Sequence, residues 1–192
     1  MKICVLKLNP RFWAMLKAWH QQSKTSWSES SSVWLVGLDP GETTGFAVWN
    51  PVDKELYLTQ LITKSPEEGF KAIKEAIRLT VPNIEADSDT IDAAHAVRPI
   101  IVCEDYKVYG WKADSHKWAG LHTPQLIGAI RVLAMQEDYP IHFQMAQEAK
   151  SWATDSQLTD WGAYEPGQRH ARDASRHILR YMFFGFNKSG ST

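Results

Sequence analysis

Cysteine is scarce in this sequence, and long hydrophobic runs are missing. The two cysteines, Cys4 and Cys103, lie far apart and give neither a disulfide framework nor a thiolate zinc motif. No apolar run approaches the about 18 residues that a membrane span needs. The formal net charge is −1, so no overall basic excess indicates nucleic acid, although a basic stripe on one face would suffice. We expect a globular protein of a reducing, cytosol-like compartment that does not enter a membrane.

The length and the local composition predict one main domain with short flanking segments. The 192 residues suffice for one full core but not for two ordinary domains. Residues 1–32 are basic, with no acid before Glu29, and end in a Ser-rich stretch. We interpret them as an accessory helix at about Pro10–Gln22 on a flexible linker, or alternatively as an organellar targeting segment. The main domain is expected over 33–186, followed by a disordered tail over 187–192.

Hydrophobic patterns and turn signals predict strands followed by alternating helices and strands. Ser65 is a helix N-cap, with Glu68 three residues later as the partner of a capping box. Residues 157–162 are expected to be irregular. The expected strands are 33–39, 46–50, 55–63, 99–104 and 141–145, and the expected helices are 66–80, 123–134, 147–154 and 166–184. This order predicts a mixed α/β sheet with helices on its faces.

Acidic residues end two of the predicted buried strands. Asp39 ends the first strand, just before a Pro-Gly turn, and Glu104 ends the strand that begins near Pro99. A buried carboxylate is costly unless a cation or hydrogen bonds compensate it. Ligands of open α/β sheets bind outside the carboxyl ends of the strands. Both acids are therefore candidates for a functional site.

The last predicted helix carries a histidine and an acid on one face. His170 and Asp173 are three residues apart and therefore share one side of a helix. Together with two strand-end carboxylates they give a mainly oxygen ligand set, which suits Mg²⁺ or Mn²⁺. Two such ions about 4 Å apart activate a water and stabilise the leaving oxygen of a phosphodiester. The pattern predicts a centre for metal-dependent phosphodiester hydrolysis.

Each of these four residues also has an ordinary structural explanation. Asp39 suits a Pro-Gly turn, and Glu104, next to Asp105, suits an exposed strand end. His170 suits a helix surface, and Asp173 suits an ion pair with a neighbouring arginine. The metal hypothesis depends on the four residues occurring together, in this order.

Three motifs give the chain a resemblance to a known family. GLDPGETTGFAV, IVCED and RHARDASRH resemble the RuvC-type Holliday-junction resolvases of the ribonuclease H-like superfamily, most of all their bacteriophage members. The resemblance covers about Val33–Phe184 in element order. It implies an α/β ribonuclease H-like fold, in which a mixed five-stranded sheet begins with an antiparallel meander of three strands and carries helices on both faces.

The resemblance also implies a site and a reaction. Asp39, Glu104 and Asp173 correspond to the acids of the family, and His170 to a position where the family carries an acid or a histidine. These residues would hold two Mg²⁺, with Mn²⁺ as a substitute, in a homodimer. The homodimer would nick two opposed strands of a four-way DNA junction and leave 5′-phosphates. Lys150 lies about where the family places a basic residue near the scissile phosphate.

Basic and aromatic residues indicate where DNA would bind. Phosphate contacts are expected from three parts of the chain. They are an arginine row on the last helix, the connection between the expected strand 99–104 and the expected helix 123–134, and one further lysine: Arg169, Arg172 and Arg176; Lys107, Lys112 and Lys117; and Lys150. Tyr109, Trp111 and Trp118 are candidates for base stacking. The alternatives are a solvated helix face and aromatic side chains that pack the connection onto the domain.

The sequence thus favours a metal-dependent, structure-selective DNA endonuclease of a bacterial or phage-infected cell. An RNA–DNA hybrid nuclease or a flap nuclease on the same fold is the first alternative, and a non-catalytic DNA-binding module is the second. The turn after Asp39 also resembles the phosphate-binding turn of actin-like ATPases and sugar kinases. Those proteins need a second such domain, for which this chain has no room.

Overall fold

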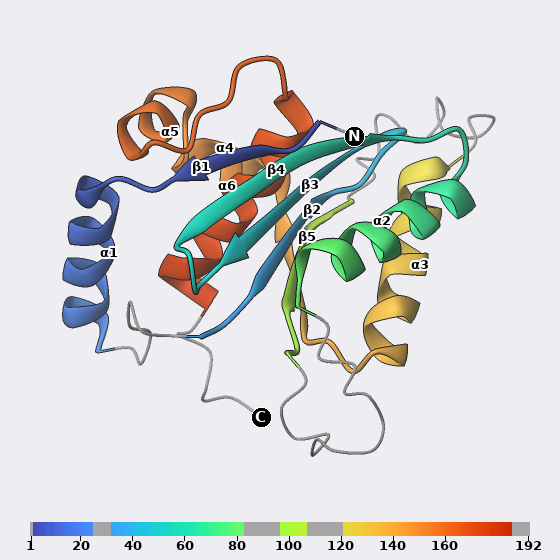
Figure 1. Cartoon of the computed structure of the whole chain (residues 1–192), viewed down its shortest axis with the longest axis horizontal. Coiled ribbons are helices and arrows are strands. Elements are labelled where there is room, and N and C mark those ends of the chain that lie inside the picture. The colour runs from blue at the N-terminus through green and yellow to red at the C-terminus, as the bar shows by residue number, and fades with distance from the viewer. Residues whose placement is uncertain (1, 25–31, 83–96, 107–120, 186–192) are drawn as a thin grey trace.

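A six-stranded mixed sheet forms the centre of the protein (Figure 1). The computed structural model describes residues 2–24, 32–82, 97–106 and 121–185. The strands are β1 (Cys4–Lys7), β2 (Leu35–Asp39), β3 (Thr43–Asn50), β4 (Glu55–Ile62), β5 (Ile100–Asp105) and β6 (Ile141–Met145). Their spatial order is β1-β4-β3-β2-β5-β6, with β2, β5 and β6 parallel to one another and the remaining pairs antiparallel. The meander of β2, β3 and β4 confirms the predicted antiparallel arrangement of the three strands between residues 33 and 63.

Helices cover both faces of this sheet. One face carries α2 (Pro66–Thr80) and α3 (His122–Gln136). The other face carries α1 (Pro10–Ser23), α4 (Ala146–Trp152), α5 (Asp155–Trp161) and α6 (Arg169–Phe184). Ser65 caps α2 as predicted, because the backbone N–H of Glu68 donates to Ser65 Oγ at 3.2 Å. The predicted capping box is incomplete, because the Glu68 carboxylate accepts from the backbone N–H of Lys64 at 2.9 Å instead. In the part of the chain described, the structure contains no helix with the length and apolarity of a membrane span.

Strand β2 shows how the two cores are built. All five of its residues are buried, as expected for a central strand with helices on both sides. Side chains alternate along a strand, so Leu35 packs towards α6 whereas Val36 and Leu38 pack towards α2 and α3. The same alternation directs Asp39, the last residue of β2, to the side of α6.

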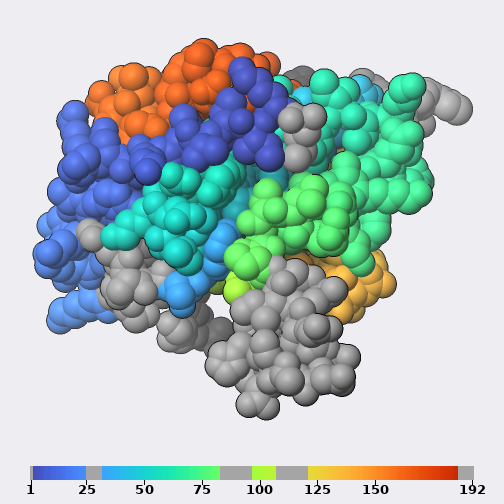
Figure 2. Space-filling model, in the orientation of Figure 1, coloured from blue at the N-terminus to red at the C-terminus, as the bar shows by residue number. Residues whose placement is uncertain are grey.

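The predicted sheet of five strands is wrong by one strand. β1 pairs with β4 in antiparallel register, with Leu6 opposite Leu56. The predicted helix at the N-terminus is present as α1, but its Phe12 and Leu16 are fully buried in the core beside α6. Figure 2 shows the blue N-terminal segment lying along β4 and against the orange region of α5. β1 has four residues, and its partner strand lies some fifty positions later in the chain, so local sequence patterns do not predict it.

Helix α5 replaces the irregular segment that we expected over residues 157–162. Thr154 and Gln157 form a full capping box, in which the side chain of each binds the backbone of the other. Gly162 ends the helix with a φ of 76°, a left-handed conformation that favours glycine. Both signals are visible in the sequence, as a Thr and a Gln three residues apart and a Gly after the last turn.

Candidate active site

The sheet places Asp39 and Glu104 next to each other. Strands β2 and β5 run parallel, with Leu38 opposite Cys103, and the next residue of each strand is one of the two acids. Leu38 and Cys103 belong to the core under α2 and α3, so alternation turns both acids to the opposite face. Asp39 is only 7% exposed, and its neighbour Glu104 is half-buried. The two predicted strand-end acids therefore meet under α6.

Two glycines let α6 approach this edge of the sheet closely. A Cβ at Gly45 would lie 1.9 Å from the carbonyl oxygen of His170, and one at Gly37 would lie 2.3 Å from that of Ala174. The first turn of α6 is also held from β4, because the backbone N–H of His170 donates to Gln60 Oε1 at 3.1 Å. These contacts fix the start of α6 above the ends of β2 and β5.

Helix α6 brings the other two predicted residues to the acids. His170 Nδ1 lies 2.9 Å from Asp39 Oδ2. Asp173, which is 3% exposed, and Glu104 both face the ammonium group of Lys150 on α4. Lys150 Nζ lies 3.1 Å from Asp173 Oδ2 and 3.8 Å from Glu104 Oε2. All four predicted residues thus gather at one place, with a lysine among them.

The pKa values of the two neighbouring acids, Asp39 and Glu104, are shifted in opposite directions from their ordinary values. Burial, followed by the negative charge of Glu104, raises the pKa of Asp39 to about 6, against the opposing hydrogen bond from His170. Burial is also the largest influence on Glu104, but the hydrogen bond from His177 and the charge of Lys150 outweigh it and lower the Glu104 pKa. Crowded carboxylates of this kind need a cation, as the sequence argument assumed.

Two further residues of α6 support the site: His177, which was not predicted, and Arg176, which was predicted as a DNA contact. His177 is fully buried, with Nε2 3.3 Å from Glu104 Oε2 and Nδ1 3.2 Å from Gln144 Oε1 on β6. Arg176 donates to both Asp173 and Asp155 and, through Nε, to the carbonyl of Ala153 at 2.6 Å. Their positions three and four residues after Asp173 were the available signal, because this spacing puts all three on one side of the helix.

Arg176, which was predicted as a DNA contact, does not lie on an exposed face. Arg176 is 7% exposed because α6 lies between the sheet and helices α4 and α5, which leaves the helix without a broad solvent face. Arg172 is also mostly covered: it donates to the Glu165 carbonyl at 2.8 Å and lies over the Tyr164 ring. Arg169 is exposed. The remaining predicted contacts on the connection after β5 lie outside the described residues, namely Lys107, Lys112, Lys117, Tyr109, Trp111 and Trp118.

The donor chemistry of the site fits a divalent cation, although the donors are not arranged around one. Three carboxylates and an imidazole are the ligand types that Mg²⁺ and Mn²⁺ accept. Within the described ranges, however, no group of three or more histidine, cysteine or acidic side chains is arranged to hold a metal ion. The ammonium of Lys150 instead lies between Asp173 and Glu104.

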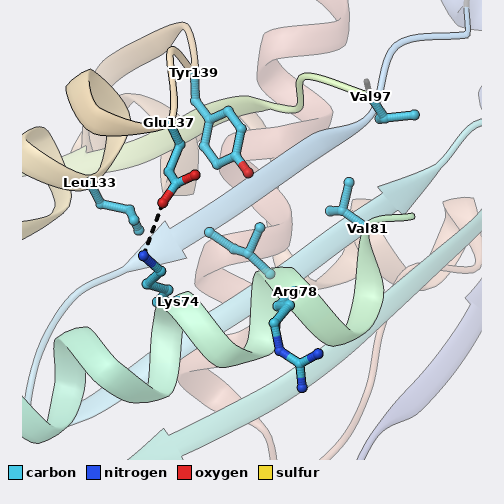
Figure 3. A pocket seen from close by; sticks show the side chains of 8 residues that line it. Lys74, Arg78, Val81, Val97, Leu133, Glu137 and Tyr139 are labelled. Carbon is cyan, nitrogen blue, oxygen red and sulfur yellow. Dashed lines mark hydrogen bonds and ion pairs between the residues drawn. The ribbon is translucent and has the colours of Figure 1, made fainter. Parts of the chain in front are cut away.

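A pocket of about 130 Å³ lies on the other side of the sheet (Figure 3). Its lining includes Val81, Leu133 and Tyr139, and an ion pair of 2.9 Å joins Lys74 of α2 to Glu137 just after α3. None of the four predicted site residues lines it. The pocket is therefore separate from the acidic centre, which lies at the carboxyl ends of the central strands β2 and β5.

A solved structure confirms the fold that the motifs predict. The chain is similar to T. thermophilus RuvC in complex with a Holliday junction substrate, with a TM-score of 0.56 and 15% identity over 83% of this chain and 98% of that chain. A second Thermus thermophilus RuvC structure gives a TM-score of 0.47 and 14% identity, over 80% and 95% of the two chains. No protein-family model matches the sequence, and no curated protein matches it significantly. At this identity the comparison concerns the fold alone: the chain has the ribonuclease H-like α/β fold of RuvC.

Proposed function

We propose that this protein is a divalent-metal-dependent DNA endonuclease that resolves four-way junctions. The observation that carries the proposal is the gathering of Asp39, Glu104, His170 and Asp173 at one edge of a RuvC-like sheet. Two of them come from adjacent parallel strands and two from one helix turn, although 134 positions separate the first from the last in the sequence. Carboxylates that are buried close together repel one another and lose their hydration, so such a cluster is unusual unless a cation binds there.

The proposed ligands are the three carboxylates and His170, which would hold two Mg²⁺ or Mn²⁺. Such ions supply water activation and stabilisation of the leaving oxygen in phosphodiester hydrolysis. The protein contributes positioning: His177 holds Glu104, Arg176 holds Asp173, and His170 holds Asp39. Reacting groups must be fixed to within fractions of an ångström for efficient catalysis, and these bonds provide that constraint.

We propose DNA contacts from those described basic residues whose side chains are accessible to solvent. Arg169 and Lys150 are accessible, with the Lys150 side chain 41% exposed, and are retained as phosphate contacts. Arg172 is retained as a weaker candidate because little of it is accessible. The lysines and aromatic residues between 107 and 118 stay a prediction. A homodimer is part of the proposal, because a two-fold protein suits paired cuts in a two-fold junction.

Incision of a synthetic four-way junction tests the proposal. The wild-type protein should make symmetric nicks with 5′-phosphates in Mg²⁺ and none in Ca²⁺, and light scattering of the same sample should give the mass of a dimer. Asp39→Asn and Asp173→Asn should bind the junction without cutting it. Asp105→Asn is the matched control: this acid also ends β5, but it points to the other face and accepts from the N–H of Tyr106.

The outcomes separate the alternatives. Preferred cutting of RNA–DNA hybrids or flaps in a competition would assign the same site to another nuclease activity. Junction binding without cleavage in either Mg²⁺ or Mn²⁺ would make the protein a binding module. Full activity of the Asp173→Asn protein would remove that residue from the site.

A further inference from the structure

Lys150 occupies the space between two of the proposed metal ligands. It projects from α4, and its Nζ contacts Asp173 Oδ2 at 3.1 Å and Glu104 Oε2 at 3.8 Å. The Asp173 side chain is 4% exposed, whereas the Lys150 side chain is 41% exposed. An ammonium that reaches in from the surface therefore neutralises the buried Asp173 and the half-buried Glu104.

Arg176 shows the contrast between a fixed cation and a movable one. It pairs with the other carboxylate oxygen of Asp173, is itself buried, and is held by Ala153 and Asp155 as well. Among the described residues, Lys150 forms ion pairs with Asp173 and Glu104 alone, and it is a point charge on a flexible four-carbon stem that water already reaches. Of the two cations on Asp173, Lys150 is the one that can withdraw without opening the core.

We propose that Lys150 is the resident cation of the metal-free centre and that an incoming divalent ion displaces its ammonium from Asp173 and Glu104. The proposal rests on the proposed function, because it requires that the acids bind metal. It follows from charge: a divalent ion and an ammonium cannot share the same carboxylate oxygens without strong repulsion. It also accounts for the arrangement of the donors, which are placed around a lysine nitrogen rather than around a shared metal position.

Calorimetric titration of the full-length protein with Mn²⁺, without DNA, tests this displacement. Lys150→Met keeps the length of the side chain and removes its charge. It should bind Mn²⁺ about tenfold more tightly than the wild type, since the metal no longer breaks an ion pair to a buried acid; this ratio equals about 1.4 kcal/mol. Thermal melts supply a second readout: without metal the variant should melt below the wild type, and Mn²⁺ should raise its melting temperature by more.

Two control variants separate the effect of the charge at position 150 from the effect of removing a positive charge elsewhere. Lys150→Arg keeps a cation at the site and should bind Mn²⁺ no more tightly than the wild type. Lys74→Met removes an equal charge from an ion pair of 2.9 Å with Glu137, which lines the pocket on the other side of the sheet. Its Mn²⁺ affinity should equal that of the wild type.

The result that overturns the displacement alone is equal or weaker Mn²⁺ binding by Lys150→Met, while Asp173→Asn still abolishes binding. In that case the metal centre stands and Lys150 does not compete for it. Absence of saturable Mn²⁺ binding in the wild type and in Lys150→Met alike would overturn the metal centre, and with it both proposals.

Discussion

The contact between Gly45 and the first turn of α6 gives the sharpest structural test of the site. Gly45 lies opposite Asp39 in the register of β2 and β3. A Cβ added there would be 1.9 Å from the backbone carbonyl oxygen of His170, whereas ordinary contacts begin at 3.4 Å. Gly45→Ala therefore requires a shift of about 1.5 Å between strand and helix. The obstacle is backbone, so no side-chain rotation can relieve it.

The shift should appear in both stability and activity. Overpacking typically costs about 1–3 kcal/mol, and a clash with helix backbone belongs at the upper end of that range. For a chain of this size a loss of about 3 kcal/mol lowers the melting temperature by roughly 6–12 °C. Because His170 and Asp173 move with the helix, junction incision at a temperature where the variant is folded should fall by roughly 100-fold.

Gly128→Ala is the matched control for this substitution. Gly128 lies inside α3, and a Cβ there would meet nothing within 4 Å. Alanine favours helix over glycine by about 1 kcal/mol, so this variant should be slightly more stable and fully active. A Gly45→Ala protein with the melting temperature and Mn²⁺ affinity of the wild type would refute the close approach of α6 to the sheet, and with it the geometry of the site.

Two further predictions concern the acids and the N-terminal segment. Burial and the charge of Glu104 raise the pKa of Asp39 to about 6, so the stability that its proton contributes is complete below about pH 4 and is lost as the pH rises through about 6. Metal-free thermal melts from pH 4 to 7 should show this loss in the wild type. If Asp39→Asn lost stability over the same pH range as the wild type does, the assignment to Asp39 would be contradicted. Phe12→Ala should lower the free energy of unfolding by about 3–5 kcal/mol, because Phe12 is fully buried against Trp161 and Phe183. Urea denaturation measures this free energy, with Val52→Ala as the control because Val52 is 77% exposed. A decrease below about 1 kcal/mol in Phe12→Ala would show that α1 is not part of the core.

Local patterns were sufficient for most of the elements and for the places of the candidate site residues at strand ends and on α6. The apolar runs that end in Asp39 and Glu104 form buried parallel strands, and Ser65 caps α2 as its spacing predicts. His170 and Asp173 share one side of α6 because three residues make nearly one helical turn. These features depend on residues close together in the chain, so a sequence contains the whole signal.

Contacts between distant residues decided the rest. The pairing of β1 with β4, the hydrogen bond from His170 to Gln60 and the position of Lys150 between Asp173 and Glu104 all join segments that local periodicity cannot relate. Arg176 was predicted as an exposed DNA contact, but Ala153 and Asp155, where α4 ends and α5 begins, cover it and make it a buried partner of Asp173. The sequence therefore determined which acids end the buried strands and which residues share one side of α6, because helix and strand periodicity is local. Only tertiary packing decided which cations those acids meet, because that depends on how helices from separate parts of the chain lie on the sheet.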